Sequence, residues 1–194
     1  MTFPDRRRLP LEFDALRLAR DLRTAESDGW IAHFVQDNYE GEWSVIPLRA
    51  KAGATHPIMM IYSDPFCREF VDRPLLDSCP YFKEVLASFA CPVQAARLMR
   101  LGSGSTILEH RDFDLDVEQG AARIHIPIVT SPEVVFLLNG VAVEMQAGSC
   151  WYLRLSDPHA VENRGKEARV HLVVDMTANA WLENLIADPS LQEA

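Results

Sequence analysis

The sequence predicts a mainly β protein, a sandwich or barrel of short strands with helices packed outside it. From residue 93 onward, eight short runs rich in β-branched and apolar residues follow one another, separated by turn signals of Gly, Pro and Asn. Helical patterns lie before and after this run of strands. Eight strands suit a jelly roll, but the pattern alone does not separate a jelly roll from an immunoglobulin-like sandwich.

The N-terminal half is expected to be a mixture of helices and strands. Residues 1–13 have no regular pattern and are expected to form an arm, with the basic run Arg6-Arg7-Arg8 in solvent. A helix over 14–27 follows, because leucines and alanines recur at helical spacing and Asp14 can cap the first turn. Four further elements are expected before the barrel: strands over 42–50 and 56–64, and short helices over 65–78 and 80–90.

The predicted barrel and the helix after it complete the chain. The eight strands are expected over 93–101, 106–112, 122–130, 133–138, 141–146, 149–155, 159–163 and 168–175, and the last helix over 178–187. Asn139-Gly140 is the strongest hairpin signal, because this dipeptide readily adopts positive φ. We therefore expect one domain over 1–194: a lead-in over 1–92 that covers the barrel, a jelly-roll core over 93–176, and a C-terminal helix and tail over 177–194.

Composition excludes several classes of partner. The formal net charge of −9 argues against binding to nucleic acid or to an anionic membrane surface, since both require a basic patch. The chain shows neither a secretory signal pattern nor an apolar run of the roughly 18 residues that a membrane span needs. The four cysteines form no CxxC unit, so they are expected to be buried small hydrophobes in a cytoplasmic protein.

Two histidines and an aspartate indicate a metal site. Residues i and i+2 of a strand face the same way, so His110 and Asp112 can bind one cation together, and His159 at the start of a later strand can complete the set. Two histidines and one carboxylate on one face form the facial triad of non-haem Fe(II) oxygenases. The spacing alone is weak, since a surface histidine beside a solvated aspartate gives the same pattern.

An arginine at the start of an apolar strand strengthens the metal hypothesis. Arg169 precedes VHLVV, with His171 on the same face, and an arginine is rarely buried without an anionic partner. If His159 ends one strand and Arg169 begins its hairpin neighbour, both side chains can enter one pocket. A planar guanidinium there suits the distal carboxylate of a 2-oxo acid that chelates the metal at its other end.

Other polar residues are expected to be structural. Arg97 and Arg100 precede the first histidine on one strand; we expect them in ion pairs at the rim of the pocket, and the alternative is that one of them points into it. His33 and His56 lie in weakly patterned segments, and structural or surface roles are expected for both.

Several segments resemble one known family. ARLMRLGSGSTILEHRDFD, ARIHIPIVT, GSCWYLRLSDPHAVENRG and ARVHLVVD are similar to the aspartyl/asparaginyl β-hydroxylase family of 2-oxoglutarate oxygenases, which includes bacterial hydroxylases of free amino acids such as proline. The upstream segment GEWSVIPLR extends the resemblance into the N-terminal half. It implies a double-stranded β-helix, a cupin-like variant of the jelly roll.

The resemblance also implies a role for individual residues. His110, Asp112 and His159 are implied as Fe(II) ligands. Arg169 is implied to bind the distal carboxylate of 2-oxoglutarate, with His125 as a further contact to this cosubstrate, and Arg123 to face the substrate.

The sequence departs from some eukaryotic relatives at two positions. Members that act on protein domains can lack the carboxylate ligand, whereas Asp112 is present here, as in the bacterial branch. Those members use a serine to help bind 2-oxoglutarate where Met99 stands in this chain.

The sequence therefore predicts an Fe(II)- and 2-oxoglutarate-dependent dioxygenase. It would hydroxylate an unactivated C–H bond of an amino acid or of an aspartyl or asparaginyl residue, with succinate and CO2 as coproducts. Two other classes stay open at this stage. One is a cupin-like metal-binding protein or isomerase that needs no 2-oxoglutarate, and the other is a non-enzymatic β-sandwich interaction module. The sequence leaves the substrate and the oligomeric state open.

Overall fold

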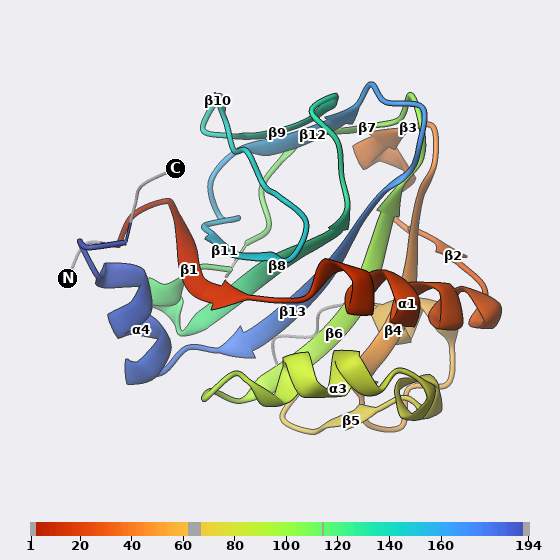
Figure 1. Cartoon of the computed structure of the whole chain (residues 1–194), viewed down its shortest axis with the longest axis horizontal. Helices are drawn as coiled ribbons and strands as arrows, with labels where there is room; N and C mark the ends of the chain where they lie inside the picture. Colours follow the sequence, from red (N-terminus) through yellow and green to blue (C-terminus); the bar gives the residue numbers. More distant parts are fainter. Residues whose placement is uncertain (1–2, 62–66, 114, 192–194) are drawn as a thin grey trace.

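A computed structural model shows two facing antiparallel sheets, and it describes residues 3–61, 67–113 and 115–191. The larger sheet has the order β1-β11-β8-β13-β6-β4-β2, with β5 also paired to β4. The smaller sheet has the order β10-β9-β12-β7-β3 and lies above the larger one in Figure 1. The predicted jelly roll with flanking helices is confirmed.

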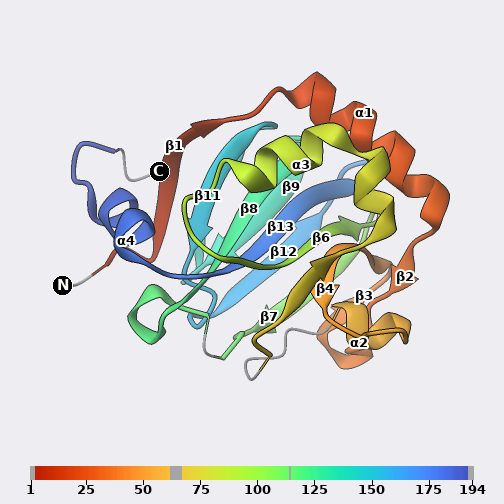
Figure 2. The same cartoon turned by 90° about the horizontal axis from the view of Figure 1, so that it is seen from below.

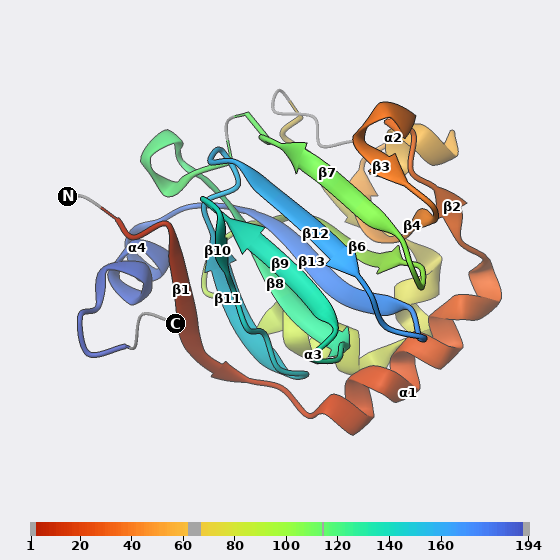
Figure 3. The same ribbon diagram turned by 90° about the horizontal axis from the view of Figure 1, so that it is seen from above.

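The strands are β1 (Arg6–Glu12), β2 (Ile31–Ala32), β3 (Tyr39–Glu40), β4 (Trp43–Lys51), β5 (Phe70–Asp72), β6 (Val93–Leu101), β7 (Thr106–His110), β8 (Ala121–Val129), β9 (Val134–Leu138), β10 (Val141–Ala142), β11 (Ser149–Leu153), β12 (His159–Asn163) and β13 (Arg169–Thr177). The α-helices are α1 (Ala15–Ala25), α2 (Pro57–Ile61), α3 (Pro80–Ala87) and α4 (Ala180–Ala187). Figures 2 and 3 show α1 and α3 against the outer face of the larger sheet, and α4 beside β1.

Two apolar cores lie on the two sides of the larger sheet. The first core lies between this sheet and the helices and includes Leu172 and Val174. The second lies between the two sheets and includes Val173 and Phe136. Because side chains alternate along a strand, β13 contributes to both cores, and its inward face also carries Arg169. The functional candidates therefore project into the space between the sheets.

The Asn-Gly hairpin forms as predicted. Asn139 and Gly140 have φ values of 52° and 73°, and Val141 pairs with Leu138 across the turn. Positive φ at both central residues matches the right-handed twist of the two strands. The turn sets the end of β9 beside the start of β12, where His159 pairs with Leu138.

The N-terminal arm and its basic run were predicted wrongly. Residues 6–12 form β1, which pairs with β11. Arg6 and Arg7 are buried: Arg6 pairs with Asp5 and donates to Leu138 O at 2.9 Å, and Arg7 donates to Ile186 O at 2.9 Å. Only a partner strand distant in sequence makes this segment regular, so no local pattern reveals it.

Two elements of the lead-in also differ from the prediction. The expected strand over 56–64 is the short helix α2 up to residue 61, because Pro57 suits a first helical turn, and the rest lies outside the described residues. The expected helix over 65–78 is replaced by β5 and a 3₁₀ turn over Pro74–Ser78, while 65 and 66 lie outside the described residues.

The expectation of buried cysteines holds for three of the four. All four cysteines are free thiols, and Cys79, Cys91 and Cys150 are buried. Burial raises the pKa of both Cys79 and Cys91 to about 11, so these thiols stay protonated at neutral pH. Among the described residues, none of the helices has the length and apolarity required to span a membrane.

A buried carboxylate joins α1 to α3. Asp21 is 2% exposed, and its Oδ2 accepts hydrogen bonds from the backbone N–H of Tyr81 at 2.7 Å and of Phe82 at 3.1 Å. These donors have no partner within α3, because they lie in its first turn. Asp21 therefore caps a helix that is distant in sequence.

We expect Asp21→Ala to lower the free energy of unfolding by about 1–3 kcal/mol, because two buried donors lose their acceptor. Asp21→Asn should lower the free energy of unfolding by less, since the amide oxygen still accepts hydrogen bonds from the two backbone N–H groups. Urea denaturation measures the change. Asp28→Ala, at an exposed position, is the control. An Asp21→Ala midpoint equal to that of the control would rule out the cap.

Candidate metal centre

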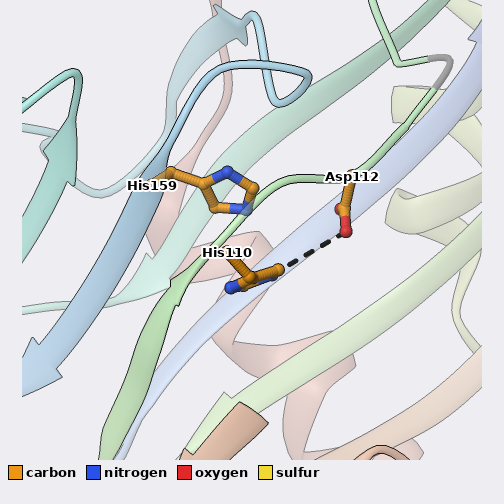
Figure 4. Close-up of side chains that lie close together, drawn as sticks. All are labelled: His110, Asp112 and His159. Carbon is orange, nitrogen blue, oxygen red and sulfur yellow. Dashed lines mark ion pairs between the residues drawn. The ribbon is translucent and has the colours of Figure 1, made fainter.

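His110, Asp112 and His159 converge at one end of the barrel. His110 ends β7 and His159 begins β12, and the two residues are directly paired across these strands. Their ring centroids are 4.3 Å apart. Asp112 follows β7, where its backbone N–H donates to Leu155 O at 2.8 Å. Figure 4 shows the three side chains pointing toward one another.

The distances within this cluster suit a single cation. One ligand atom from each residue lies within 4.8 Å of the others, and His110 Nε2 is 3.7 Å from Asp112 Oδ1. Two imidazoles and one carboxylate at this separation occupy one side of a common point. This is the donor set of the facial triad.

A hydrogen bond at Nδ1 of each histidine leaves Nε2 available to bind a metal. His110 Nδ1 lies 2.8 Å from Leu108 O, and His159 Nδ1 lies 3.0 Å from Asp157 O. A carbonyl oxygen only accepts, so each Nδ1 carries the proton and each Nε2 keeps its lone pair. Burial lowers the pKa of His159 to about 4, which keeps this imidazole neutral at physiological pH. The residues therefore fit a divalent metal.

A network of buried charges holds the carboxylate of Asp112. Arg123 donates through Nη1 to Asp112 Oδ2, and through Nε to Asp175 Oδ1 at 2.6 Å. Asp175 Oδ2 also accepts from Arg97 Nη2 at 2.7 Å. Burial alone would lower the pKa of Arg123, but Asp175 and Asp112 hold it above its usual value. This network occupies Oδ2 of Asp112, and Oδ1 faces the histidines.

Arg169 lies farther along β13 without an anionic partner. Its side chain is 3% exposed, and its Nη2 lies 2.7 Å from His171 Nδ1. Among the described residues, no carboxylate pairs with it and its Nε has no hydrogen-bond partner. Burial lowers the pKa of Arg169 to about 9, which is the signature of a cation without compensation. An anionic ligand would supply that compensation.

His125 lies between Arg169 and the cluster of His110, Asp112 and His159. Its Nδ1 is 3.4 Å from His171 Nδ1, and its Nε2 has no partner among the residues that the structure describes. Its position is set by β8, where it pairs with Trp151 of β11 and with Val173 of β13.

One cavity of about 550 Å³ joins these groups. Its polar lining includes His110, Asp112, His159, His125, Arg123 and Arg169. Apolar side chains such as Phe136 and Met99 form other parts of the wall. The structure thus brings together all of the site residues expected from the sequence.

Three details differ from the expectations. His159 and Arg169 begin strands of opposite sheets, so they face each other across the barrel and are not hairpin neighbours. Arg97 is ion-paired as expected, but it is buried and lines the cavity, whereas Arg100 pairs with Glu42 at the surface.

His33 is a cavity residue that sequence reasoning missed. Its ring stacks on that of Trp43 with centroids 3.5 Å apart, and Trp43 in turn lies 6.4 Å from the ring of His110. Burial lowers the pKa of His33 to about 4, so it is neutral at physiological pH. No local signal identifies His33, because only the placement of β2 and β4 brings it to the cavity.

These features define the class of protein. A jelly roll with two histidines and one carboxylate close together in one cavity has the donor set of mononuclear non-haem metal sites. Comparisons with known proteins give the family. The family profile for aspartyl/asparaginyl β-hydroxylase matches residues 12–179. The chain belongs to the aspartyl/asparaginyl β-hydroxylase family, which confirms the resemblance.

The chain is similar to a curated relative and to solved structures. It is 27% identical over 179 residues to L-proline cis-4-hydroxylase of Rhizobium meliloti (strain 1021), covering 91% of this chain and 62% of that protein. A 2OG-Fe(II) oxygenase family oxidoreductase from Burkholderia pseudomallei has a TM-score of 0.52 and 16% identity, covering 87% of this chain and 84% of the other. A Pseudomonas putida prolyl-4-hydroxylase has a TM-score of 0.52 and 12% identity, covering 91% and 94%. The two structures support the fold.

We expect His159→Ala to weaken the binding of Co(II) or Mn(II) by at least about 100-fold, since it removes a ligand and even outer contacts of a metal site are worth 10–100-fold. Isothermal titration calorimetry measures the affinity. His33→Ala is the matched control, because His33 lines the same cavity outside the cluster. Equal metal affinity in His159→Ala and the unmodified protein would remove His159 from the ligand set.

Proposed function

We propose that this protein is an Fe(II)- and 2-oxoglutarate-dependent hydroxylase. The single observation that carries the proposal is the buried, uncompensated Arg169 in the cavity that also contains the cluster of His110, Asp112 and His159. A metal-binding barrel without a cosubstrate has no use for a buried cation at a distance from the metal. A 2-oxo diacid would use both groups: its 2-oxo acid end binds the metal, and its distal carboxylate binds Arg169.

Each site residue then has a defined task. His110, Asp112 and His159 hold Fe(II) through two neutral imidazoles and one carboxylate. Bound Fe(II), 2-oxoglutarate and dioxygen supply the chemistry that hydroxylates a C–H bond and releases succinate and CO2. Arg169 binds the distal carboxylate, and His125 contributes a further polar contact along the cosubstrate. The apolar wall that includes Phe136 and Met99 limits the access of water to the reacting centre.

Arg123 serves the metal ligand and, in our proposal, the substrate. Its contact with Asp112 orients a ligating carboxylate, as outer contacts do in other metal sites. Arg97 and Arg123 both line the cavity and both contact Asp175. Two guanidinium groups at this end of the cavity are suitable donors for a carboxylate-bearing substrate.

We propose a free amino acid as the substrate and L-proline as the first candidate. The support is the similarity to L-proline cis-4-hydroxylase, of which this chain spans about three fifths of the length. Aspartyl or asparaginyl residues of a peptide would compete as substrates in this family. The net charge of −9 and the free thiols support a cytoplasmic protein without a nucleic-acid or membrane partner.

Arg169→Ala should weaken 2-oxoglutarate binding by roughly 30-fold or more. Removal of one partner of a buried charge pair costs about 2–5 kcal/mol, and each ~1.4 kcal/mol is a factor of ten in affinity. The affinity of Arg169→Lys for 2-oxoglutarate should lie between those of the native protein and Arg169→Ala, because an ammonium keeps the charge but loses the planar geometry of the guanidinium. The measurement is titration of 2-oxoglutarate into the Mn(II)-loaded protein without oxygen.

Arg100→Ala is the matched control for this titration, because Arg100 lies at the surface on the same sheet. Pyruvate lacks the distal carboxylate, so it should bind weakly to the native protein and lose little more in Arg169→Ala. An unchanged affinity for 2-oxoglutarate in Arg169→Ala would favour the metal-binding protein or isomerase without 2-oxoglutarate turnover.

L-Proline should raise succinate formation at least about tenfold above the uncoupled background, since a substrate held near the metal makes the reaction productive. L-Proline methyl ester should not do so, because it offers no carboxylate to the arginine end of the cavity. The assay compares both with a panel of free amino acids and peptides containing Asp or Asn. Stimulation by the peptides alone would move the substrate class to peptidyl residues.

A further inference from the structure

A second cavity lies directly behind Arg169. It has a volume of about 440 Å³ and is formed by residues 130–132 after β8 and residues 143–147 after β10, together with four strand residues of β9 and β13. Phe136 and Arg169 line both this cavity and the one that contains the metal cluster, whereas His171 lines only the second. The Arg169 guanidinium carbon lies 6.0 Å from the centre of the Phe136 ring. These two side chains are the partition between the cavities.

The order of residues along β13 places the second cavity at the end remote from the metal. Asp175 lies beside Arg123 near the metal cluster, and Arg169 is six residues earlier on the same face of the strand. At a rise of about 3.3 Å per residue, their Cα atoms are roughly 20 Å apart. A ligand that extends from the metal to Arg169 therefore points toward the second cavity.

The partition carries hydrogen-bond donors that nothing in the described structure satisfies. Arg169 Nη2 can only donate, so His171 Nδ1 must accept in their 2.7 Å contact. The ring proton of His171 is therefore on Nε2. This Nε2–H is without a partner in the described residues, as is Arg169 Nε–H, and His171 is 1% exposed. Buried donors of this kind call for an acceptor.

The chemistry of these donors selects an anionic oxygen ligand. A guanidinium and an imidazole N–H beside each other suit a carboxylate, which offers only acceptors. Glu144 and Gln146 also line the second cavity, but both side chains belong to exposed residues at its rim. The acceptor that fits the donors of Arg169 and His171 is the terminal carboxylate of a ligand that extends from the metal side.

We propose that the second cavity extends the cosubstrate pocket, and that the protein accepts straight-chain 2-oxo diacids longer than 2-oxoglutarate. The first of these is the six-carbon 2-oxoadipate, whose terminal carboxylate would reach Arg169 Nε–H and His171 Nε2–H. This inference rests on the proposed function. The reaction balances as it does with 2-oxoglutarate: C1 leaves as CO2, one atom of dioxygen enters the remaining diacid, here glutarate, and the other enters the hydroxyl group.

The test is the binding of 2-oxoglutarate and 2-oxoadipate to the Mn(II)-loaded full chain without oxygen, followed by calorimetry. We expect the two dissociation constants to agree within about tenfold. Val143→Phe should weaken 2-oxoadipate at least tenfold relative to 2-oxoglutarate, because Val143 is buried in the wall of the second cavity only. Val141→Phe is the matched control, since Val141 is exposed two residues earlier and lines neither cavity.

Met145→Trp provides a second way to fill the cavity if Val143→Phe does not fold, because Met145 is only partly buried. If the protein binds 2-oxoglutarate but binds 2-oxoadipate more weakly by 100-fold or more, the inference is overturned and the proposed function stays intact. Equal losses of affinity for both 2-oxo acids in Val143→Phe and Met145→Trp would also overturn it. Failure of both 2-oxo acids to bind the unmodified protein would instead contradict the proposed function.

Discussion

The alternation of side chains along β13 is the constraint on which the rest of the structure depends. This strand lies between β6 and β8 at the centre of the larger sheet, with both of its faces buried. One face packs on the helices through aliphatic residues, and the other carries Arg169, His171, Val173 and Asp175 into the barrel. A shift of register by one residue would exchange these faces, placing three polar side chains in the apolar core under the helices. The register of β13 therefore determines both the packing of the sheet on the helices and the placement of the site residues.

The interior tolerates its charges in two different ways. Near the metal cluster, Asp175 neutralises Arg97 and Arg123, and Arg123 also contacts Asp112, so each charge has a partner within the protein. At the other end, the neutral His171 is the one hydrogen-bond partner that the described residues offer to Arg169. In the first arrangement the paired charges offset one another's cost of burial, whereas the second leaves part of that cost uncompensated until an anion binds. The same barrel thus contains a structural charge network and a binding site.

The sequence was most informative where function and local pattern coincide. Strands after residue 93 were recognised because alternation and turn residues act locally, and His110, Asp112 and His159 because the strand period sets their direction. Predictions failed where distant segments decide the outcome. β1 becomes regular only through β11, and His33 reaches the cavity only because β2 pairs with β4. The pairing of Arg123 with both Asp112 and Asp175 likewise depends on three-dimensional register, which no spacing in the sequence reveals.

The hydrogen bonds that fix both imidazoles and Arg123 bear on the choice of metal. The carbonyl oxygens of Leu108 and Asp157 orient the two imidazoles, and Asp175 orients Arg123, which contacts the carboxylate of Asp112. Two imidazoles with one carboxylate accept most divalent ions of the first transition series. Affinity then follows the general order in which nickel, copper and zinc exceed iron. Selection of iron would rest on the supply of metals around the protein, and nickel or zinc would compete with iron as inert occupants.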